Sequence, residues 1–328
     1  MGKLFQRTAG APAGSGRVFA RCSSLLSVVD SADLDCVCDN VALLLAHAGV
    51  ADVRTPFALD WRFDLVEGRG GRPRLDLPPA SLPELLAERT GFTLEWRPVG
   101  ALDEAVAEWR EALGRGEPVL VVGDAFDLPW VPYHGRKHLD HGFVVEGVED
   151  GVTHVVDAYD NVTQWGRAEP LATTVPVTDL AAALEDGSWT LLVRVGDAAP
   201  LDLGERLADN AAAIVAAEAD GSYRRFVEAH SEPDEPTLDN LTLQTWLLAR
   251  NRSLHARWLA DQEELGDLPE RFESEVVAAW RRAAETAYMA LRRVSAGRQP
   301  PPAALHAAEA AVAAEPALAA ELLPAVSV

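Results

Sequence analysis

The sequence contains no hydrophobic run long enough to cross a bilayer. Its longest apolar stretches, VALLLA from Val41 and PVLVVG from Pro118, are far shorter than the roughly 20 residues that a transmembrane helix needs. The opening stretch MGKLFQRTAGAPAGSG has no continuous apolar segment of the kind that secretion signals carry. We therefore expect residues 1–17 to form a flexible tail and the protein to be cytoplasmic.

Cysteine is also scarce. The three cysteines, Cys22, Cys36 and Cys38, cannot all pair, and Cys36 and Cys38 are too close in sequence to form a relaxed disulfide. A reducing compartment fits best. Cys-x-Cys, even taken with the histidines between residues 134 and 141, matches no common four-ligand zinc spacing, so we expect no metal.

Basic residues are few for a chain of this length. With 29 Lys and Arg against 51 Asp and Glu, the formal net charge is -22. Such a chain would struggle to build the basic face that neutralises nucleic-acid phosphates. A general nucleic-acid role is therefore improbable, and cationic or neutral partners are favoured.

The hydrophobic pattern predicts an α+β fold followed by a helical region. The 328 residues, 48% hydrophobic, suffice for one large domain or two modest ones. We expect a mixed domain over residues 18–200, a helical domain or lid over 201–296, and an Ala/Pro-rich, loosely packed tail over 297–328. Short apolar runs predict antiparallel strands at residues 118–123, 142–148, 152–157 and 189–195.

The segment DLDCVCDNVALLLAHAGV places Cys36 at the start of a helix that Gly49 closes. The helix dipole and the unpaired N–H groups of a first turn favour a thiolate, and those N–H groups could also hold an oxyanion. Asp33, Asp35 and Asp39 oppose the thiolate by charge repulsion. A nearby imidazolium is therefore required.

The segment HLDHGFVVEGVEDGVTHVVDAYDN supplies that imidazole. His141 opens an apolar strand, Asp150-Gly151 forms a turn, and a second strand runs into Asp157. In this hairpin His141 and Asp157 lie almost opposite each other, within a residue or two of register. An aspartate placed there can fix the tautomer and orientation of the histidine, which predicts a Cys/His/Asp catalytic centre.

These motifs resemble known families. The DC dipeptide, the helix and its closing glycine, followed about a hundred residues later by HGFVVEG and an aspartate-closed strand, look like the papain-like fold of C39 peptidases. More closely, GEPVLVVGDAFDLPWVPYH leading into HLDHGFVVEG resembles the amino-terminal domain of the butirosin-biosynthesis acyltransferase family.

The resemblance implies a cysteine acyltransferase of specialised metabolism. Cys36 would attack a thioester on the phosphopantetheine arm of an acyl or peptidyl carrier protein, and the acyl group would pass to a small-molecule amine, with no resident cofactor. C39 peptidases usually place a glutamine shortly before the cysteine, whereas SVVDSADLDC contains none. The oxyanion hole is therefore unassigned, and an alignment shifted by two residues makes Cys38 the nucleophile.

Further residues are candidates for substrate contact. Cys38 adjoins the nucleophile, Trp61 could line an acyl pocket or simply pack, and Asp124 could position a loop or cap a strand. Tyr133 and His138 flank a locally basic stretch that could meet a pantetheine phosphate or remain a solvated loop. Two other functions stay open: a cysteine peptidase or amidase with the same triad, and a non-catalytic scaffold that binds a carrier protein.

Overall fold

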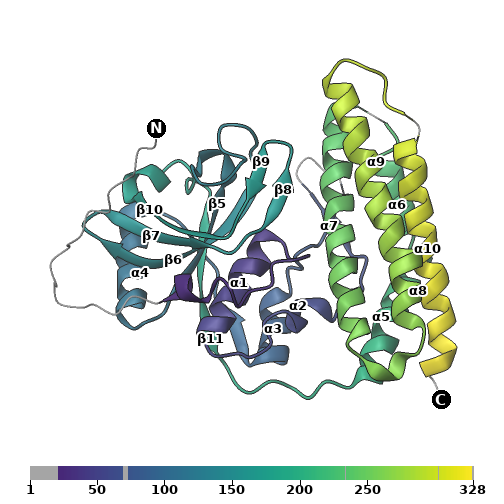
Figure 1. Ribbon diagram of the computed structural model, residues 1–328, viewed down its shortest axis with the longest axis horizontal. Coiled ribbons are helices and arrows are strands. Elements are labelled where there is room, and N and C mark those ends of the chain that lie inside the picture. The colour runs from purple at the N-terminus through teal and green to yellow at the C-terminus, as the bar shows by residue number, and fades with distance from the viewer. Residues whose placement is uncertain (1–20, 69–72, 233, 302, 327–328) are drawn as a thin grey trace, which may run out of the picture.

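The computed structural model describes residues 21–68, 73–232, 234–301 and 303–326. The expected flexible tail over residues 1–17 lies outside them. Figure 1 shows a part built around a β-sheet beside an elongated bundle of helices. The fold is α+β, with antiparallel sheets and helices in succession, as the sequence pattern predicts.

The main sheet is antiparallel throughout, in the order β10-β7-β6-β5-β11-β3, with β4 paired to β11. The four strands that the apolar runs predict are all present. The strand bounds are β3 Phe92–Leu94, β4 Arg97–Pro98, β5 Val119–Asp124, β6 Asp140–Glu149, β7 Val152–Asp157, β10 Leu171–Pro176 and β11 Ser188–Arg194. Two small hairpins are β1 Leu65–Glu67 with β2 Pro73–Leu75, and β8 Asn161–Thr163 with β9 Gly166–Ala168.

Helices cover both faces of this sheet. They are α1 Cys36–His47, α2 Thr55–Ala58, α3 Leu82–Thr90 and α4 Leu102–Gly114, with short 3-10 turns at η1 Cys22–Leu25, η3 Ala125–Asp127 and η4 Val177–Leu180. Val144 of β6 packs in the core that contains α1, whereas its neighbour Val145 packs in the core around Trp109 of α4. Because successive side chains of a strand point to opposite faces, burial on both faces explains why these strands are continuous apolar runs rather than alternating ones.

The second part is helical. It contains α5 Leu203–Ala219, α6 Ser222–Ala229, α7 Glu235–Ala260, η5 Glu263–Leu265, α8 Leu268–Arg271, a π-helical turn η6 Phe272–Val277, α9 Ala278–Ser295 and α10 Ala303–Val326. The prediction of a loosely packed tail after residue 297 is wrong for α10. Alanine is the strongest helix former, and its small side chain lets α10 pack closely, with Ala308, Ala311 and Leu318 fully buried.

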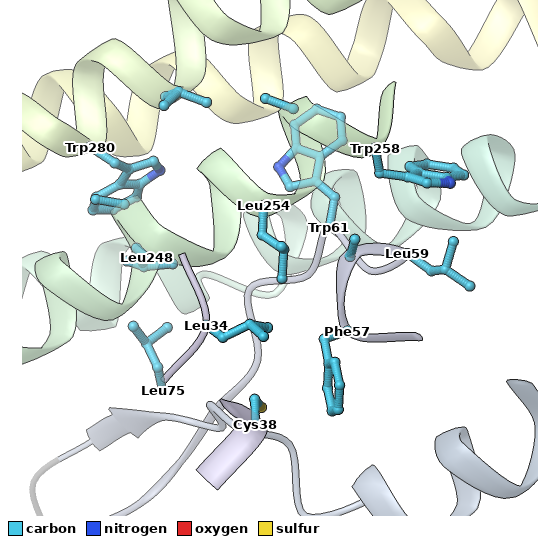
Figure 2. Close-up of a cluster of buried hydrophobic side chains, with 14 of the residues drawn as sticks. Leu34, Cys38, Phe57, Leu59, Trp61, Leu75, Leu248, Leu254, Trp258 and Trp280 are labelled. Carbon is cyan, nitrogen blue, oxygen red and sulfur yellow. The ribbon is translucent and has the colours of Figure 1, made fainter. Parts of the chain in front are cut away.

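The two parts share one hydrophobic core, which Figure 2 shows from close by. Leu34, Phe57 and Leu75 of the first part meet Leu248 and Leu254 of α7 in this cluster. The helical part therefore packs directly against one side of the sheet-containing part, and the two parts are not separate units. None of the helices in the described ranges is long and apolar enough to cross a membrane.

Candidate active site

The amino-terminus of α1 presents Cys36 as the first helical residue. Asp35 caps the helix, since one oxygen of its side chain accepts hydrogen bonds from Val37 N and Cys38 N, both at 2.9 Å. These two N–H groups are therefore occupied and do not form the oxyanion site that the sequence suggests. Across the parts of the chain that the structure describes, no acceptor is found for the Cys36 N–H, which points outward at the helix terminus and is a candidate oxyanion donor.

A glycine lets α1 approach the sheet at this point. A Cβ atom on Gly142 of β6 would come within 3.0 Å of the Cys36 carbonyl oxygen and 3.3 Å of Val37 Cα. Both contacts are with backbone, which cannot rotate away. Gly142 thus lets the residue before it, His141, lie beside the residue that carries the thiol.

His141 and Asp157 form a buried pair. His141 Nε2 lies 2.7 Å from Asp157 Oδ2, and the two side chains are 0% and 4% exposed. Beyond a bulge between Val145 and Gly147, the strands pair with Val144 opposite Val156. Continued along the strands, this register makes His141 and Asp157 diagonal neighbours rather than directly opposite residues. The prediction of their proximity is confirmed, within the register range expected.

The pair shifts the charge state of both partners. Burial alone would lower the pKa of His141, but the charge of Asp157 and the hydrogen bond to it outweigh burial and raise that pKa to about 10. Burial would raise the pKa of Asp157. The charge of His141 and the hydrogen bonds that the Asp157 carboxylate accepts nevertheless hold that pKa below its usual value. At neutral pH the pair is therefore an imidazolium and a carboxylate.

The Cys36 thiol lies beside the His141 imidazole. His141 Nδ1 is buried, and it has no hydrogen-bond partner among the described residues. A contact with Cys36 nevertheless contributes to the raised pKa of His141, and Cys36 Sγ lies 3.8 Å from the carbonyl oxygen of the adjacent Asp140. The thiol and the imidazole are thus neighbours.

Two residues that the sequence reasoning missed complete the centre. Asn40 is fully buried, and its amide donates to Cys36 O and Gly142 O, both at 2.9 Å, and to Asp157 Oδ1 at 3.2 Å. Trp130 Nε1 donates to Asp157 Oδ2 at 3.1 Å. The available signal was Asn40 itself, an amide one turn after Cys36 in an otherwise apolar helix.

Asp39 behaves differently from the expectation that it repels a thiolate. It is 0% exposed, and neither carboxyl oxygen has a hydrogen-bond partner among the described residues. Burial, which opposes ionisation in the absence of such partners, raises the pKa of Asp39 well above its usual value despite the charge of Arg250. Protonation of Asp39, which this burial favours, lessens its repulsion of a Cys36 thiolate.

Cys38 faces away from His141. It packs in the shared core beside Leu34 and Phe57 (Figure 2). Burial, followed by the negative charge of Asp35, raises the pKa of the Cys38 thiol well above its usual value. These surroundings keep Cys38 protonated.

The remaining candidates occupy different surroundings. Trp61 is buried in the shared core, edge-on to Phe272 at 4.9 Å between ring centroids. Tyr133 lies closer to the centre, because its hydroxyl is 3.3 Å from that of Tyr159, whose ring meets His141 edge-on at 5.4 Å. Tyr133 is thus connected to the His141 imidazole through Tyr159.

Asp124 and His138 form a second pair near the end of β5. His138 Nδ1 lies 2.6 Å from Asp124 Oδ2, and the imidazole, 71% exposed, stacks on Phe126 at 4.2 Å. In the same stretch Lys137 reaches Asp239 of α7 at 2.5 Å. This loop is therefore fixed to the helical part rather than freely solvated.

A cavity of about 360 Å³ lies on the Cys38 side of α1, between the sheet-containing part and α7. Its wall includes Leu34, Asp35, Cys38, Leu75, Arg250 and Leu254. A volume of this size lies in the range of small-molecule sites, which are often found at such interfaces. Asp35, which directly precedes Cys36, lines this cavity, whereas Cys36, His141 and Asp157 do not.

Within the described ranges, no group of three or more His, Cys, Asp or Glu side chains is arranged to hold a metal ion. All three cysteines are free thiols. The side chains that the structure brings together here are the thiol of Cys36, the imidazole of His141 and the carboxylate of Asp157.

Comparison with known proteins agrees with the sequence motifs. No curated protein matches the chain significantly. A family model described as butirosin biosynthesis protein H, N-terminal, matches residues 35–158. The match begins at the residue that caps α1 and ends one residue after Asp157, so it includes Cys36, His141 and Asp157. Over this segment the chain is similar to the amino-terminal domain of butirosin biosynthesis protein H, the family that its motifs predict.

Proposed function

We propose that the chain is a cysteine-dependent acyltransferase of specialised metabolism with a papain-like centre, in which Cys36 is the nucleophile, His141 the acid and base, and Asp157 the orienting group. The observation that carries this proposal is the buried His141–Asp157 pair, 2.7 Å between Nε2 and Oδ2, beside a thiol at a helix amino-terminus. The similarity to the butirosin family supports acyl transfer as the reaction.

The first half of the reaction forms a thioester on the protein. The Cys36 thiolate attacks the carbonyl carbon of an acyl thioester borne by the phosphopantetheine arm of a carrier protein, and the carbonyl oxygen gains negative charge. The Cys36 N–H, for which no acceptor is found in the described ranges, is placed to donate to that oxygen. The pantetheine sulfur leaves and takes the proton from His141 Nδ1.

The second half transfers the acyl group. Neutral His141 accepts a proton from the incoming amine through Nδ1 as the nitrogen attacks the acyl-Cys36 carbonyl, and the Cys36 thiolate is released with its imidazolium partner restored. Asp157 keeps Nε2 protonated throughout, so that Nδ1 is the nitrogen that exchanges the proton. No resident cofactor enters these steps.

The test is to incubate the protein with an acyl-pantetheine thioester and a panel of primary amines, and to follow free thiol and amide product separately. Amide formation that requires both Cys36 and the amine supports the transferase. Thiol release that is indifferent to amines would indicate a hydrolase with the same centre. Cleavage of peptide substrates but not of thioesters would indicate a peptidase, and binding of a carrier protein without turnover would indicate a scaffold.

A further inference from the structure

The segment just before the nucleophile is held from two sides. Ser31 Oγ donates to Ala158 O at 2.6 Å, which ties the segment to the residue that follows Asp157. Asp33 adopts φ of +73°, in the left-handed region. This conformation costs a non-glycine residue about 1 kcal/mol or more, and it persists only where the surrounding structure imposes it. The position of residues 30–35 therefore depends on external contacts.

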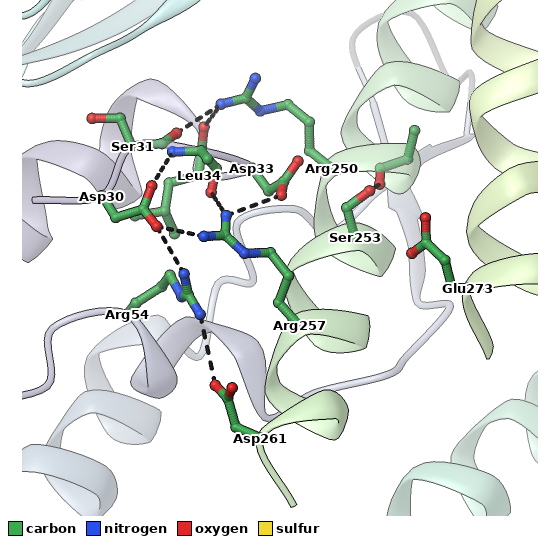
Figure 3. A network of polar contacts seen from close by, with 12 residues as sticks. Asp30, Ser31, Asp33, Leu34, Arg54, Arg250, Ser253, Arg257, Asp261 and Glu273 are labelled. Carbon is green, nitrogen blue, oxygen red and sulfur yellow. Dashed lines mark hydrogen bonds and ion pairs between the residues drawn. The ribbon is translucent and has the colours of Figure 1, made fainter. Parts of the chain in front are cut away.

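The second set of contacts comes from α7, more than 200 residues away in sequence. Figure 3 shows the network. Arg250 donates to Ser31 O at 3.2 Å and to Leu34 O, and Arg257, two helical turns further on, donates to Ala32 O at 3.3 Å and pairs with Asp30 and Asp33. Two arginines on one face of α7 thus hold the segment of residues 30–35 by hydrogen bonds and ion pairs.

The two arginines differ in where they act. Arg257 is 36% exposed, and its ion-pair partner Asp30 is 51% exposed and also paired with Arg54. Ion pairs exposed to this degree contribute little. Arg250 instead donates to the carbonyl oxygen of Leu34, two residues before Cys36. Its guanidinium also stacks on the ring of Trp246, with 4.8 Å between the guanidinium carbon and the ring centroid. Trp246 packs against the same hydrophobic core as Cys36.

The charge of Arg250 also reaches the centre. Burial raises the pKa of both Asp39 and Tyr159, and the positive charge of Arg250 opposes that rise in each case. Arg250 lines the cavity beside Asp35, and its Nε is buried without a partner among the described residues. Its guanidinium therefore lies within electrostatic range of the residues around the thiol.

We propose that Arg250 is a positioning residue for the nucleophile: by holding the carbonyl groups of Ser31 and Leu34, it sets where Cys36 meets His141. The helical part is then a component of the active site and not only a lid, because Arg250 couples α7 to the segment that leads into Cys36. The proposal rests on the proposed function only in that Cys36 is the reactive thiol.

The test measures the alkylation rate of Cys36 by iodoacetamide between pH 5 and 10, with the modified cysteine identified by peptide mapping. Wild type is compared with Arg250→Ala, Arg250→Lys and Arg257→Ala, and urea unfolding is measured for each. We expect Arg250→Ala to lower the rate at pH 7 by about tenfold or more and to move the profile toward that of an ordinary thiol. Arg257→Ala should stay within about twofold of wild type, because it loses mainly exposed contacts.

Lysine at position 250 keeps the charge but loses the planar guanidinium, which stacks on Trp246 while its Nη2 donates to both carbonyl oxygens. Arg250→Lys should therefore fall between wild type and Arg250→Ala. If Arg250→Ala shows no urea transition and is therefore unfolded, the alkylation profiles of Arg250→Lys and Arg250→Gln are compared with that of wild type instead. If a folded but destabilised Arg250 variant kept the wild-type pH profile of Cys36 alkylation, the proposal would be overturned. Arg250 would then serve only to dock the helical part on the sheet-containing part. Equal losses in the Arg250 and Arg257 variants would overturn the specific assignment. Because alkylation needs no acyl donor, these results are independent of whether the chain transfers acyl groups.

Discussion

Asn40 donates a hydrogen bond to Asp157 at 3.2 Å and, from the same amide, to the carbonyl of Cys36 at 2.9 Å. It also accepts from Ala158 N at 3.1 Å. One side chain therefore connects the helix that begins at Cys36 with the strand that ends at Asp157. The relative placement of Cys36, His141 and Asp157 depends on it.

Replacing Asn40 with Ala should therefore affect both stability and reactivity. The change leaves Ala158 N–H and two carbonyl groups without this partner in a fully buried site, so we expect a loss of about 1–3 kcal/mol in the free energy of unfolding. Cys36 alkylation should slow as well, since Asp157 loses one anchor. Urea denaturation and alkylation kinetics check both, with Asn161→Ala as a half-buried control that loses only a 3.4 Å contact.

The charge of Asp157 sets the pH range of the imidazolium. In wild type the pKa of His141 is raised to about 10, so the stability from this group is fully present below about pH 6.5, the usual histidine value, and is lost as the pH rises through about 10. Asp157→Asn removes the charge and should abolish this dependence. We expect the unfolding free energy of wild type, relative to the variant, to decrease between pH 6.5 and 10; a constant difference would contradict the assignment.

Asp39 should respond to pH in the opposite way from an ordinary surface carboxylate. Its pKa is raised well above the usual value, chiefly by burial, so its neutral form is favoured in the folded state and the associated stability is lost as the pH rises through the raised pKa. Asp39→Asn, which is neutral at every pH, should show less loss of stability on going from pH 5 to 8. Its alkylation rate at Cys36 should remain close to that of wild type, whereas a marked acceleration would show that Asp39 is ionised and repels the thiolate.

The helical part depends on a buried ion pair. Arg252 and Glu315 are both 0% exposed and 2.5 Å apart, and Glu315 also accepts hydrogen bonds from Tyr223 and Trp280. Neutralising Glu315 with Gln leaves Arg252 as a buried unpaired charge, which should cost about 3–5 kcal/mol in the free energy of unfolding. Glu321→Gln, which removes a surface partner of Arg271, is the matched control and should change stability by less than about 1 kcal/mol.

Local pattern was enough to predict the features that depend on neighbours in sequence. The strands around Val144 and Val155 follow from apolar runs, and the helix that begins at Cys36 follows from its apolar residues and its closing glycine, Gly49, whereas the capping role of Asp35 was not predicted. The His141–Asp157 pair was predictable because a tight turn at Asp150-Gly151 fixes the pairing of its two strands.

Features that depend on distant segments were not predictable from one sequence. Nothing in the alanine-rich stretch after residue 303 indicates that Glu315 reaches Arg252, so the sequence predicts a tail where the structure has a helix with a buried ion pair. The bonds from Arg250 to Ser31 and Leu34 join residues more than 200 positions apart. The multiple bonds of Asn40 likewise exist only once the helix lies on the sheet.

The central claim is that Cys36 becomes acylated, and intact-mass spectrometry tests it most directly. Wild type, Cys36→Ala and Cys38→Ala are each mixed with an acyl-pantetheine thioester and weighed before and after hydroxylamine, which cleaves thioesters. We predict a hydroxylamine-sensitive gain of one acyl group in wild type and Cys38→Ala and none in Cys36→Ala. A gain that survives in Cys36→Ala and disappears in Cys38→Ala would contradict the account, as would the absence of any gain across a series of acyl groups in a folded protein.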